Sequence, residues 1–457
     1  MDNQSSHDSM MVGMAGEQTR TTTPPPVSAS AEGEPPRTAT RAWDWSTRLL
    51  VVGIVLAALN LRPAITSLGS LLEEVRDGLG MSGSVAGLLT SVPPLCFAVF
   101  GVMAPRLARR FGPGAVVCAG MAAITAGLLL RPYAGGTAGF LAASALALMG
   151  IAVSNVLMPV IVKRHFPDRV GTMTGLYSMA LALGTSTAAA VTVPMTEALG
   201  GSWQTGLALW AGLAAAAVLP WLPLARNGGT APRGALPAGE RQEGSPEAAP
   251  RVHARVPRPP AAPLRITRSR TAWALAVFFG LQATAAYITM GWMPQIFRDA
   301  GVPAGTAGLL LAVTMAMGVP LAFVIPRVAT RLPHQGPIVL ALGGCGLVGY
   351  AGLYLAPAGG AWAWALLLGI ANCAFPLALT MVGMRARTGA GVAQLSAFAQ
   401  STGYLISIPG PLLVGVLYQH SGGWGLPLAL MAGLMVPQTV VGVLAGRDRT
   451  VEEEAAR

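Results

Sequence analysis

An arginine followed by a proline interrupts the first long apolar run of the chain, in the stretch LNLRPAITS (residues 59–67). A guanidinium at bilayer depth costs about 2.5–3.5 kcal/mol on insertion scales, so Arg62 needs a compensating partner. Pro63 has no backbone N–H and disfavours helical geometry at Arg62, which predicts opened backbone of the kind that transporters tolerate along a wet cavity. Asn60 adds a further donor and acceptor. This chemistry suits an anionic or strongly polar solute.

The sequence offers Arg62 no carboxylate at mid-membrane depth. Thirteen of the 19 Asp and Glu residues lie in the tails, just before the first apolar run or in a central polar segment. The other six lie in loops or at the ends of apolar runs: Glu73, Glu74, Asp77, Asp168, Glu197 and Asp299. We therefore expect the substrate to supply the anion. The alternative is that Arg62 reaches the outer headgroups or binds backbone carbonyls between helices.

The other reactive residue types form no recognisable site. The four cysteines lie in apolar runs without metal or redox spacing, and the five histidines lie in tails, loops or the ends of runs. We expect no metal, no cofactor and no enzymatic activity, since paired acids and bases are also missing. Protons would then travel with the solute, or the protein would exchange or equilibrate solutes. A peripheral carboxylate such as Glu74 or Glu197 could still titrate.

The composition is that of a membrane protein. Of 457 residues, 53% are hydrophobic and 11% charged, against about 25% charged in soluble domains. Twelve apolar runs, each able to cross a ~30 Å hydrocarbon core, follow one another between residues 47 and 446. The net charge of +11 is spread over the ends of these runs and one linker. A lipid bilayer, and no nucleic acid, is the expected partner.

Polar segments divide the chain into five parts. We predict a disordered tail over 1–46, a six-helix bundle over 47–224, a linker over 225–270, a second six-helix bundle over 271–446 and a tail over 447–457. Of the 30 Lys and Arg residues, 26 lie on the side of the linker and both termini. The opposite side has three, Arg76, Arg131 and Arg298. The positive-inside rule therefore predicts that both termini are cytoplasmic.

The two halves repeat each other. RDGLGMSGSVAGLL (residues 76–89) matches RDAGVPAGTAGLL (298–310), and PRLARRF (105–111) matches PRVATRL (326–332). A repeat of this length in a twelve-span chain predicts two pseudo-symmetric six-helix bundles, with a substrate site near mid-membrane between them. The fold class is therefore an all-α membrane protein with the major facilitator arrangement.

In this fold, polar residues on the inner spans are candidates for the central cavity. They are Asn155, Tyr177, Ser178, Gln282, Tyr287, Trp292, Asn372, Gln394, Ser396, Gln400 and Tyr404. Ser396, Gln400 and Tyr404 are spaced by four residues and share one helix face, while Gln394 lies on a neighbouring face. We expect Ser396, Gln400 and Tyr404 to form a stripe facing Arg62. Packing between helices is the alternative for each of them.

The loop stretch PRLARRFG resembles the major facilitator loop motif, with Pro105 in place of its first glycine and Arg109 in place of its aspartate. That aspartate normally helps to latch the halves, so a latch here would need other partners; a generic basic loop is the alternative. The motif and its repeat give the gating candidates Pro105, Arg106, Arg109, Arg110, Pro326, Arg327 and Arg331. Arg385 and Arg387 are expected to mark a cytoplasmic helix end, or alternatively to close an inner gate.

Four stretches are similar to the bacterial cyanate permease and 2-nitroimidazole transporter family of major facilitators. They are LNLRPAITSLGSLLEEVRDGLGMS, VLMPVIVKRHFPDRVGTMTGLYSMAL, YITMGWMPQIFRDAGVPAGTAGLLLA and FPLALTMVGMRARTGAGVAQLSAFAQSTGYLISIPGPLLVGVLYQHSGGW. The resemblance implies a monomeric permease of the bacterial inner membrane that moves a small anionic or polar nitrogenous solute by alternating access. Efflux of a nitroheterocycle or drug is the alternative within transport. A membrane receptor without transport is the alternative outside it.

Overall fold

The computed structural model describes residues 45–227 and 266–455, and every regular element in these two ranges is a helix. The helices of the first half are α1 (Trp45–Asn60), α2 (Pro63–Ser70), α3 (Leu72–Leu79), α4 (Gly83–Phe111), α5 (Pro113–Leu130), α6 (Thr137–His165), α7 (Val170–Ala198), α8 (Trp203–Ala208) and α9 (Trp210–Asn227). Short 3-10 turns lie at Arg131–Tyr133 and Pro167–Arg169. Nearly all of the predicted tail 1–46 and most of the predicted linker 225–270 lie outside the described residues.

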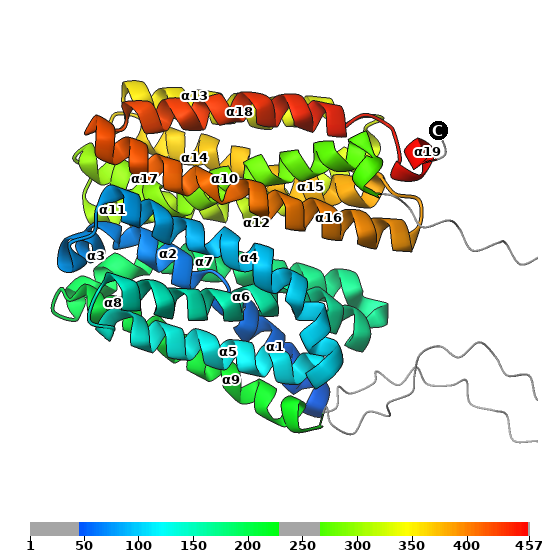
Figure 1. Ribbon diagram of the computed structural model, residues 1–457, viewed down its shortest axis with the longest axis horizontal. Coiled ribbons are helices and arrows are strands. Elements are labelled where there is room, and N and C mark those ends of the chain that lie inside the picture. Colours follow the sequence, from blue (N-terminus) through cyan, green and yellow to red (C-terminus); the bar gives the residue numbers. More distant parts are fainter. Residues whose placement is uncertain (1–44, 228–265, 456–457) are drawn as a thin grey trace, which may run out of the picture. The chain divides into compact units, whose positions relative to one another are not determined.

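The second half continues with a 3-10 turn at Ile266–Arg268 and ten helices (Figure 1). They are α10 (Arg270–Asp299), α11 (Ala304–Ala316), α12 (Gly318–Arg331), α13 (Gly336–Leu355), α14 (Ala361–Asn372), α15 (Ala374–Met384), α16 (Gly389–Ser407), α17 (Pro409–Ser421), α18 (Gly425–Ala445) and α19 (Val451–Ala455).

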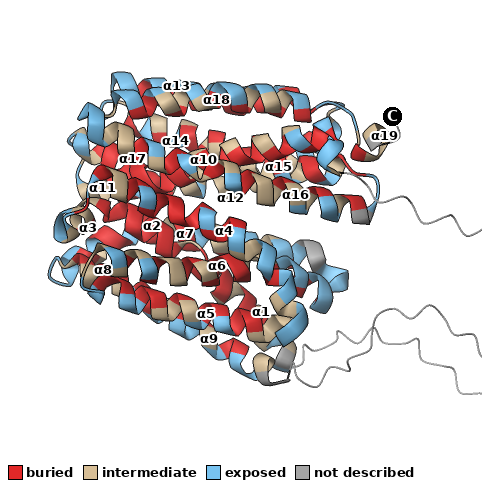
Figure 2. Ribbon diagram, in the orientation of Figure 1, coloured by how far each residue is buried: buried red, intermediate tan, exposed pale blue. Residues whose placement is uncertain are grey.

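Twelve single or paired helices among the described residues are long and apolar enough to cross a membrane. The first begins at Thr47 and the last ends at Ala445, so the prediction of an all-α, twelve-span protein is confirmed. Buried residues gather where the helices face one another, and exposed residues cover the outer faces (Figure 2). Large apolar side chains are among those exposed, including Leu219, Leu355 and Val440. Exposed apolar surface on this scale suits contact with lipid.

Several spans consist of two helices separated by a break. In span one the break lies at Leu61 and Arg62, where Pro63 opens α2. Span eleven breaks in the same manner, with Pro409 in the first turn of α17. Proline is well placed there because the first helical turn needs no N–H from it. The breaks release backbone groups inside the bundle, where they can bind neighbouring helices.

The two halves approach most closely at one end of the spans, which we call the Glu74 end. A Cβ added to Gly87 of α4 would lie 2.8 Å from the carbonyl oxygen of Leu412 on α17. One added to Gly308 of α11 would lie 2.6 Å from the carbonyl oxygen of Ala189 on α7. Only glycine permits such close backbone contact between helices. Near the opposite or linker end, a Cβ on Gly175 would lie 3.8 Å from Phe323, which is ordinary contact.

Polar contacts add to the closure of the Glu74 end. Arg298 of α10 pairs with Glu74 at 2.9 Å and with Glu73 at 2.8 Å, both on α3. Deeper in the membrane, the indole N–H of Trp292 donates to Thr90 Oγ1 on α4 at 3.1 Å. Each of these contacts joins the first half to the second.

Candidate functional site

Arg62 lies at the break between α1 and α2, with φ −127° and ψ −27°. Pro63 has no N–H to bond the Leu59 carbonyl, and Gly184 of α7 packs directly against that carbonyl oxygen. The opened backbone expected from Pro63 is therefore present. The Arg62 side chain is half-buried.

Three tyrosines lie near the Arg62 guanidinium. The Tyr287 hydroxyl on α10 is within its hydrogen-bonding reach, and its charge also acts on Tyr177 of α7 and Tyr404 of α16. The Tyr177 hydroxyl donates to Asn155 Oδ1 on α6 at 2.5 Å. These five residues, which we call the Arg62 cluster, come from five spans and from both halves. The structure thus brings together five of the thirteen candidates for the central cavity.

Aromatic rings border the Arg62 cluster. The Phe97 ring of α4 stacks on Tyr404, with centroids 5.0 Å apart and an interplanar angle of 25°. The Phe279 ring also packs against Tyr404, with centroids 5.2 Å apart and the two rings nearly perpendicular at 88°. Tyr404 of the Arg62 cluster therefore has an aromatic ring on each of two sides.

No carboxylate of the described residues forms an ion pair with Arg62. The pairs within 4 Å in this part of the chain lie at helix ends and join Arg298 to Glu73 and Glu74, Arg385 to Asp448, and Arg387 to Glu453. The described residues also contain no group of three or more His, Cys, Asp or Glu side chains that could hold a metal ion. What Arg62 offers to a ligand is a positive charge with tyrosine hydroxyls around it.

The predicted stripe on α16 divides into two parts. Tyr404 is buried in the Arg62 cluster. Ser396 and Gln400 are half-buried and bond each other, Gln400 Nε2 donating to Ser396 Oγ at 2.7 Å. Gln394, two residues before Ser396 on the same helix, is exposed.

Gln282 and Asn372 lie inside the second half. Gln282 Nε2 donates to Asn372 Oδ1 at 3.2 Å, and both residues line a small cavity with Tyr350 and Gln438. Tyr287, five residues after Gln282 on α10, does not line this cavity. Their place in the central cavity stays a prediction.

Two other candidates make contacts that stabilise the fold. Asn60 is buried, and its Nδ2 donates to the carbonyls of Leu56 at 2.7 Å and Leu213 at 3.2 Å, which ties α1 to α9. Trp292 belongs to the contacts of the Glu74 end described above. Ser178 is exposed.

The sequence places Arg131 at the outer side of the membrane, but the structure buries its side chain inside the protein. Its side chain is only 2% exposed, and Nη1 donates to the carbonyl of Ala64 on α2 at 3.0 Å. An arginine that ends an apolar run normally marks the membrane interface, which is why sequence reasoning missed it. One available signal was the loop length, since only six residues separate α5 from α6. The chain therefore buries a second arginine close to α2.

The sequence of the chain matches a family model described as Major Facilitator Superfamily over residues 50–386. The chain belongs to the major facilitator superfamily. It is 34% identical to an uncharacterized transporter of Bacillus subtilis (strain 168), covering 88% of this chain and 94% of that protein. It is 32% identical to the 2-nitroimidazole transporter of Escherichia coli (strain K12), covering 88% and 96%. The cyanate transport protein CynX of the same organism is 29% identical, covering 85% and 95%.

Solved structures share the fold of this major facilitator. The nucleoside transporter NupG superposes with a TM-score of 0.66 at 14% identity, covering 88% of this chain and 99% of that one. A D-xylose-proton symporter gives a TM-score of 0.64 at 12% identity, with coverage of 88% and 99%. The predicted fold and the resemblance to cyanate and nitroimidazole transporters are thus confirmed. The family and these relatives are transporters, in agreement with the prediction that the chain is no enzyme.

The superfamily loop motif lies on helices in this structure. The predicted loop at PRLARRFG is the last part of α4, which continues to Phe111, and its repeat is the last part of α12. Pro105, Arg106, Arg109 and Arg110 are exposed, as are Arg327 and Arg331, while Pro326 is half-buried. The helical extension presents these guanidinium groups beyond the apolar part of each span. Their gating role stays a prediction.

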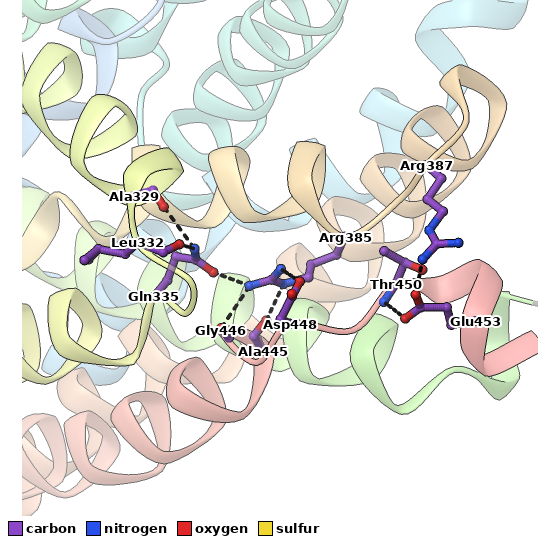
Figure 3. A network of polar contacts seen from close by, with 10 residues as sticks. All are labelled: Ala329, Leu332, Gln335, Arg385, Arg387, Ala445, Gly446, Asp448, Thr450 and Glu453. Carbon is purple, nitrogen blue, oxygen red and sulfur yellow. Dashed lines mark hydrogen bonds and ion pairs between the residues drawn. The ribbon is translucent and has the colours of Figure 1, made fainter.

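Arg385 is the centre of a buried network at the linker end (Figure 3). Nε donates to the Ala445 carbonyl at 3.1 Å and Nη2 to the Gly446 carbonyl at 2.9 Å, and Nη2 also contacts Gln335 Oε1. Burial lowers the pKa of Arg385, and the nearby Asp448 carboxylate acts in the opposite direction. All of these partners belong to the second half. Arg385 thus joins the α15 end to the α12–α13 loop and the end of α18.

Proposed function

We propose that this major facilitator moves a small anionic or polar nitrogenous solute across the bacterial inner membrane by alternating access. The observation that carries the proposal is Arg62, a half-buried arginine without a described carboxylate partner, set among tyrosines from both halves. A solute bound there would contact both bundles at once. That is the condition for coupling its binding to their relative movement. The names of two relatives, a cyanate and a 2-nitroimidazole transporter, agree with a solute of this class.

Orientation and coupling belong to the same proposal. With 26 of 30 Lys and Arg residues on the side of the termini and the linker, the linker end is cytoplasmic, so the Glu74 end faces outward and is closed. The protein acts as a monomer in two six-helix bundles with the boundaries 47–224 and 271–446. Since the sequence has no Asp, Glu or His at mid-membrane depth, protons travel with the solute, or transport is exchange or uniport.

Efflux of a nitroheterocycle is the second candidate. The stacked Phe97 and Tyr404 rings, 5.0 Å apart, favour it because a flat heterocycle gains from contact with aromatic faces. The two candidates differ in what Arg62 would meet. A charged anion would depend strongly on the guanidinium, whereas a neutral heterocycle would depend more on the rings.

A binding measurement on the purified full chain tests the role of Arg62 without assuming a direction of transport. Thermal unfolding is followed with increasing cyanate or 2-nitroimidazole, in wild type, Arg62→Gln and the control Arg109→Gln, which removes an exposed guanidinium. Loss of a hydrogen bond to a charged group costs about 1.5–3 kcal/mol, so Arg62→Gln should weaken anion binding roughly 10- to 100-fold. Equal affinity in Arg62→Gln and wild type for both ligands would disprove the assignment.

A further inference from the structure

The last turns of α4 carry three exposed guanidinium groups, those of Arg106, Arg109 and Arg110. Their side chains form no hydrogen bond or ion pair with the described residues. The one contact made by this group is that of Arg110 with the Phe111 ring, whose centre lies 5.1 Å from the guanidinium carbon. The charge of this helix end therefore has no counter-charge in the described part of the chain.

The neighbouring helix adds positive charge at the same place. α6 packs against α4, and its last turn carries the exposed residues Lys163 and Arg164. Asp168 is the one acidic residue at the linker end among the described residues of the first half. The second half differs, because α19 supplies Glu453 as the partner of Arg387. Unmatched charge at the linker end is thus greatest on α4 and α6.

Below its arginines, the same face of α4 is apolar and exposed. Val102 and Met103 are 48% and 42% exposed. They lie three and four residues before Arg106, and Arg110 follows four residues after it, so all of them share one helix face. Thr90, which bonds the other half, lies about 160° around the helix from Arg106 at 3.6 residues per turn. The exposed face therefore points to the lipid and away from the space between the halves.

The two parts of this face together suit an amphiphile with a negative head. Guanidinium groups bind phosphate oxygens through two parallel hydrogen bonds, and an acyl chain gains from contact with exposed apolar side chains. A soluble anion would leave the apolar part of the face unused. A zwitterionic headgroup would bring a positive charge close to three arginines. Basic clusters just beyond the cytoplasmic end of a transmembrane helix are typical of binding to anionic lipids.

We propose that the linker end of α4 is a binding site for an anionic phospholipid. Arg106 and Arg110 hold its phosphate, and an acyl chain lies along Val102 and Met103. Arg109 lies on the flank of this face and adds positive charge. The site is on the lipid-facing surface, apart from the Arg62 cluster, so it does not depend on which solute the protein transports.

Native mass spectrometry of the purified full chain, released from neutral detergent, measures the binding of single lipid molecules. Phosphatidylglycerol is the anionic probe, and phosphatidylcholine with the same acyl chains is the zwitterionic comparison. The decisive variant is Arg106→Gln/Arg110→Gln. The matched control is Arg447→Gln/Arg449→Gln, which removes two exposed guanidinium groups after α18 at the same end of the molecule. Both variants lose the same charge, so a difference between them reports where the charge lies.

Each basic side chain near a membrane surface strengthens the binding of anionic lipid about fivefold. We therefore expect Arg106→Gln/Arg110→Gln to bind phosphatidylglycerol about 30-fold more weakly than wild type, with little change for phosphatidylcholine. The control variant should bind both lipids as wild type does. Arg106→Lys/Arg110→Lys keeps the charge and should recover most of the affinity. Melting temperatures should not change, because the replaced side chains are exposed.

Three outcomes would overturn the site. Wild-type affinity for phosphatidylglycerol in Arg106→Gln/Arg110→Gln would show that α4 does not bind the lipid. An equal loss in both glutamine variants would mean that net charge alone attracts it. Equal binding of phosphatidylglycerol and its soluble headgroup, glycerophosphoglycerol, would leave an anion site without a role for the apolar face.

Discussion

Arg62 and Arg131 show how the position of a charge decides what it can do. Arg62 is half-buried at a helix break and has tyrosines from both halves around it. Arg131 is 2% exposed, and its Nη1 donates a hydrogen bond to the Ala64 carbonyl of α2. Neither forms an ion pair with a carboxylate of the described residues. Tyr287 borders both environments, since it lies near Arg62 and lines a cavity together with Arg131.

Tyr287→Phe should weaken the binding of a small anion about 5- to 10-fold, since it removes a hydroxyl beside Arg62 that can bind the anion, and one hydrogen bond contributes about 1 kcal/mol. The ring, and with it the packing against Phe97, is kept. The matched control is Tyr350→Phe, which removes a buried hydroxyl in the cavity of Gln282 and Asn372. Dissociation constants from calorimetry check this. If the two variants bind equally well, Tyr287 has no part in the site.

At the scale of elements, the short acidic helix α19 fastens the linker end of the second half. Glu454 accepts from Ser269 Oγ at 2.6 Å and from Thr271 Oγ1 at 2.7 Å, at the start of α10. Glu452 accepts from the backbone N–H groups of Arg387 at 3.0 Å and Thr388 at 3.2 Å, before α16. With the Arg385 network, α19 holds together elements far apart in the sequence (Figure 3).

Glu454→Gln should lower the melting temperature at pH 7, with a smaller loss at low pH. Burial alone would raise the pKa of Glu454, but the hydrogen bonds from Ser269 and Thr271 outweigh it, and the pKa is lowered. A lowered pKa in the folded state contributes stability above the unfolded pKa of about 4.3, and this contribution is lost as pH falls through the folded value. Wild type and variant should therefore converge as the pH falls below the unfolded pKa and through the lowered folded one.

The control for this prediction is Glu453→Gln, since Glu453 pairs with Arg387 at the surface and its bond from the Thr450 N–H, at 3.2 Å, can be kept by a glutamine oxygen. Surface pairs contribute about 0–1 kcal/mol, so little change is expected. Melting temperatures are measured in detergent from pH 7 to pH 3.5. A difference between wild type and Glu454→Gln that stayed constant with pH would contradict the role of the ionised carboxylate.

At the scale of the whole molecule, the described contacts between the two halves are concentrated at the Glu74 end. The Glu74 end combines glycine-mediated backbone contact with the Arg298 ion pairs and the Trp292–Thr90 hydrogen bond. Alternating access requires these contacts to separate when the other side closes. Their strength therefore sets the balance between the two states.

Arg298→Gln should increase the population open at the Glu74 end roughly tenfold, since it removes half-buried pairs to Glu73 and Glu74 worth about 1–2 kcal/mol together. Spin labels at Asp77→Cys and His420→Cys, both exposed at this end, report the separation of the halves by double electron–electron resonance. The four native cysteines are replaced by alanine beforehand.

The matched control is Asp299→Asn. This carboxylate accepts from Gln295, Tyr418 and Trp424, all within the second half, so its loss should not change the distance distribution. A distribution identical in wild type and Arg298→Gln would show that the ion pairs do not govern the closed state.

The sequence alone predicts what depends on local composition. Twelve apolar runs become twelve spans because each must satisfy its own backbone hydrogen bonds in lipid, whatever its neighbours are. The break at Arg62 was predictable for the same reason, since Pro63 removes a donor wherever the helix lies. The halves and the family resemblance follow from motifs repeated along the chain.

Only the tertiary structure decides which polar side chains meet. Gln282 and Tyr287 stand on one helix, but the first bonds Asn372 inside the second half and the second lies within reach of Arg62. Arg131 looks in the sequence like an interface residue, and it is buried because its short turn folds it against α2. Hydropathy locates each span in the sequence and therefore shows how deep in the membrane a residue lies. The direction in which its side chain points depends on how neighbouring helices rotate and pack, and that depends on contacts between residues distant in the sequence.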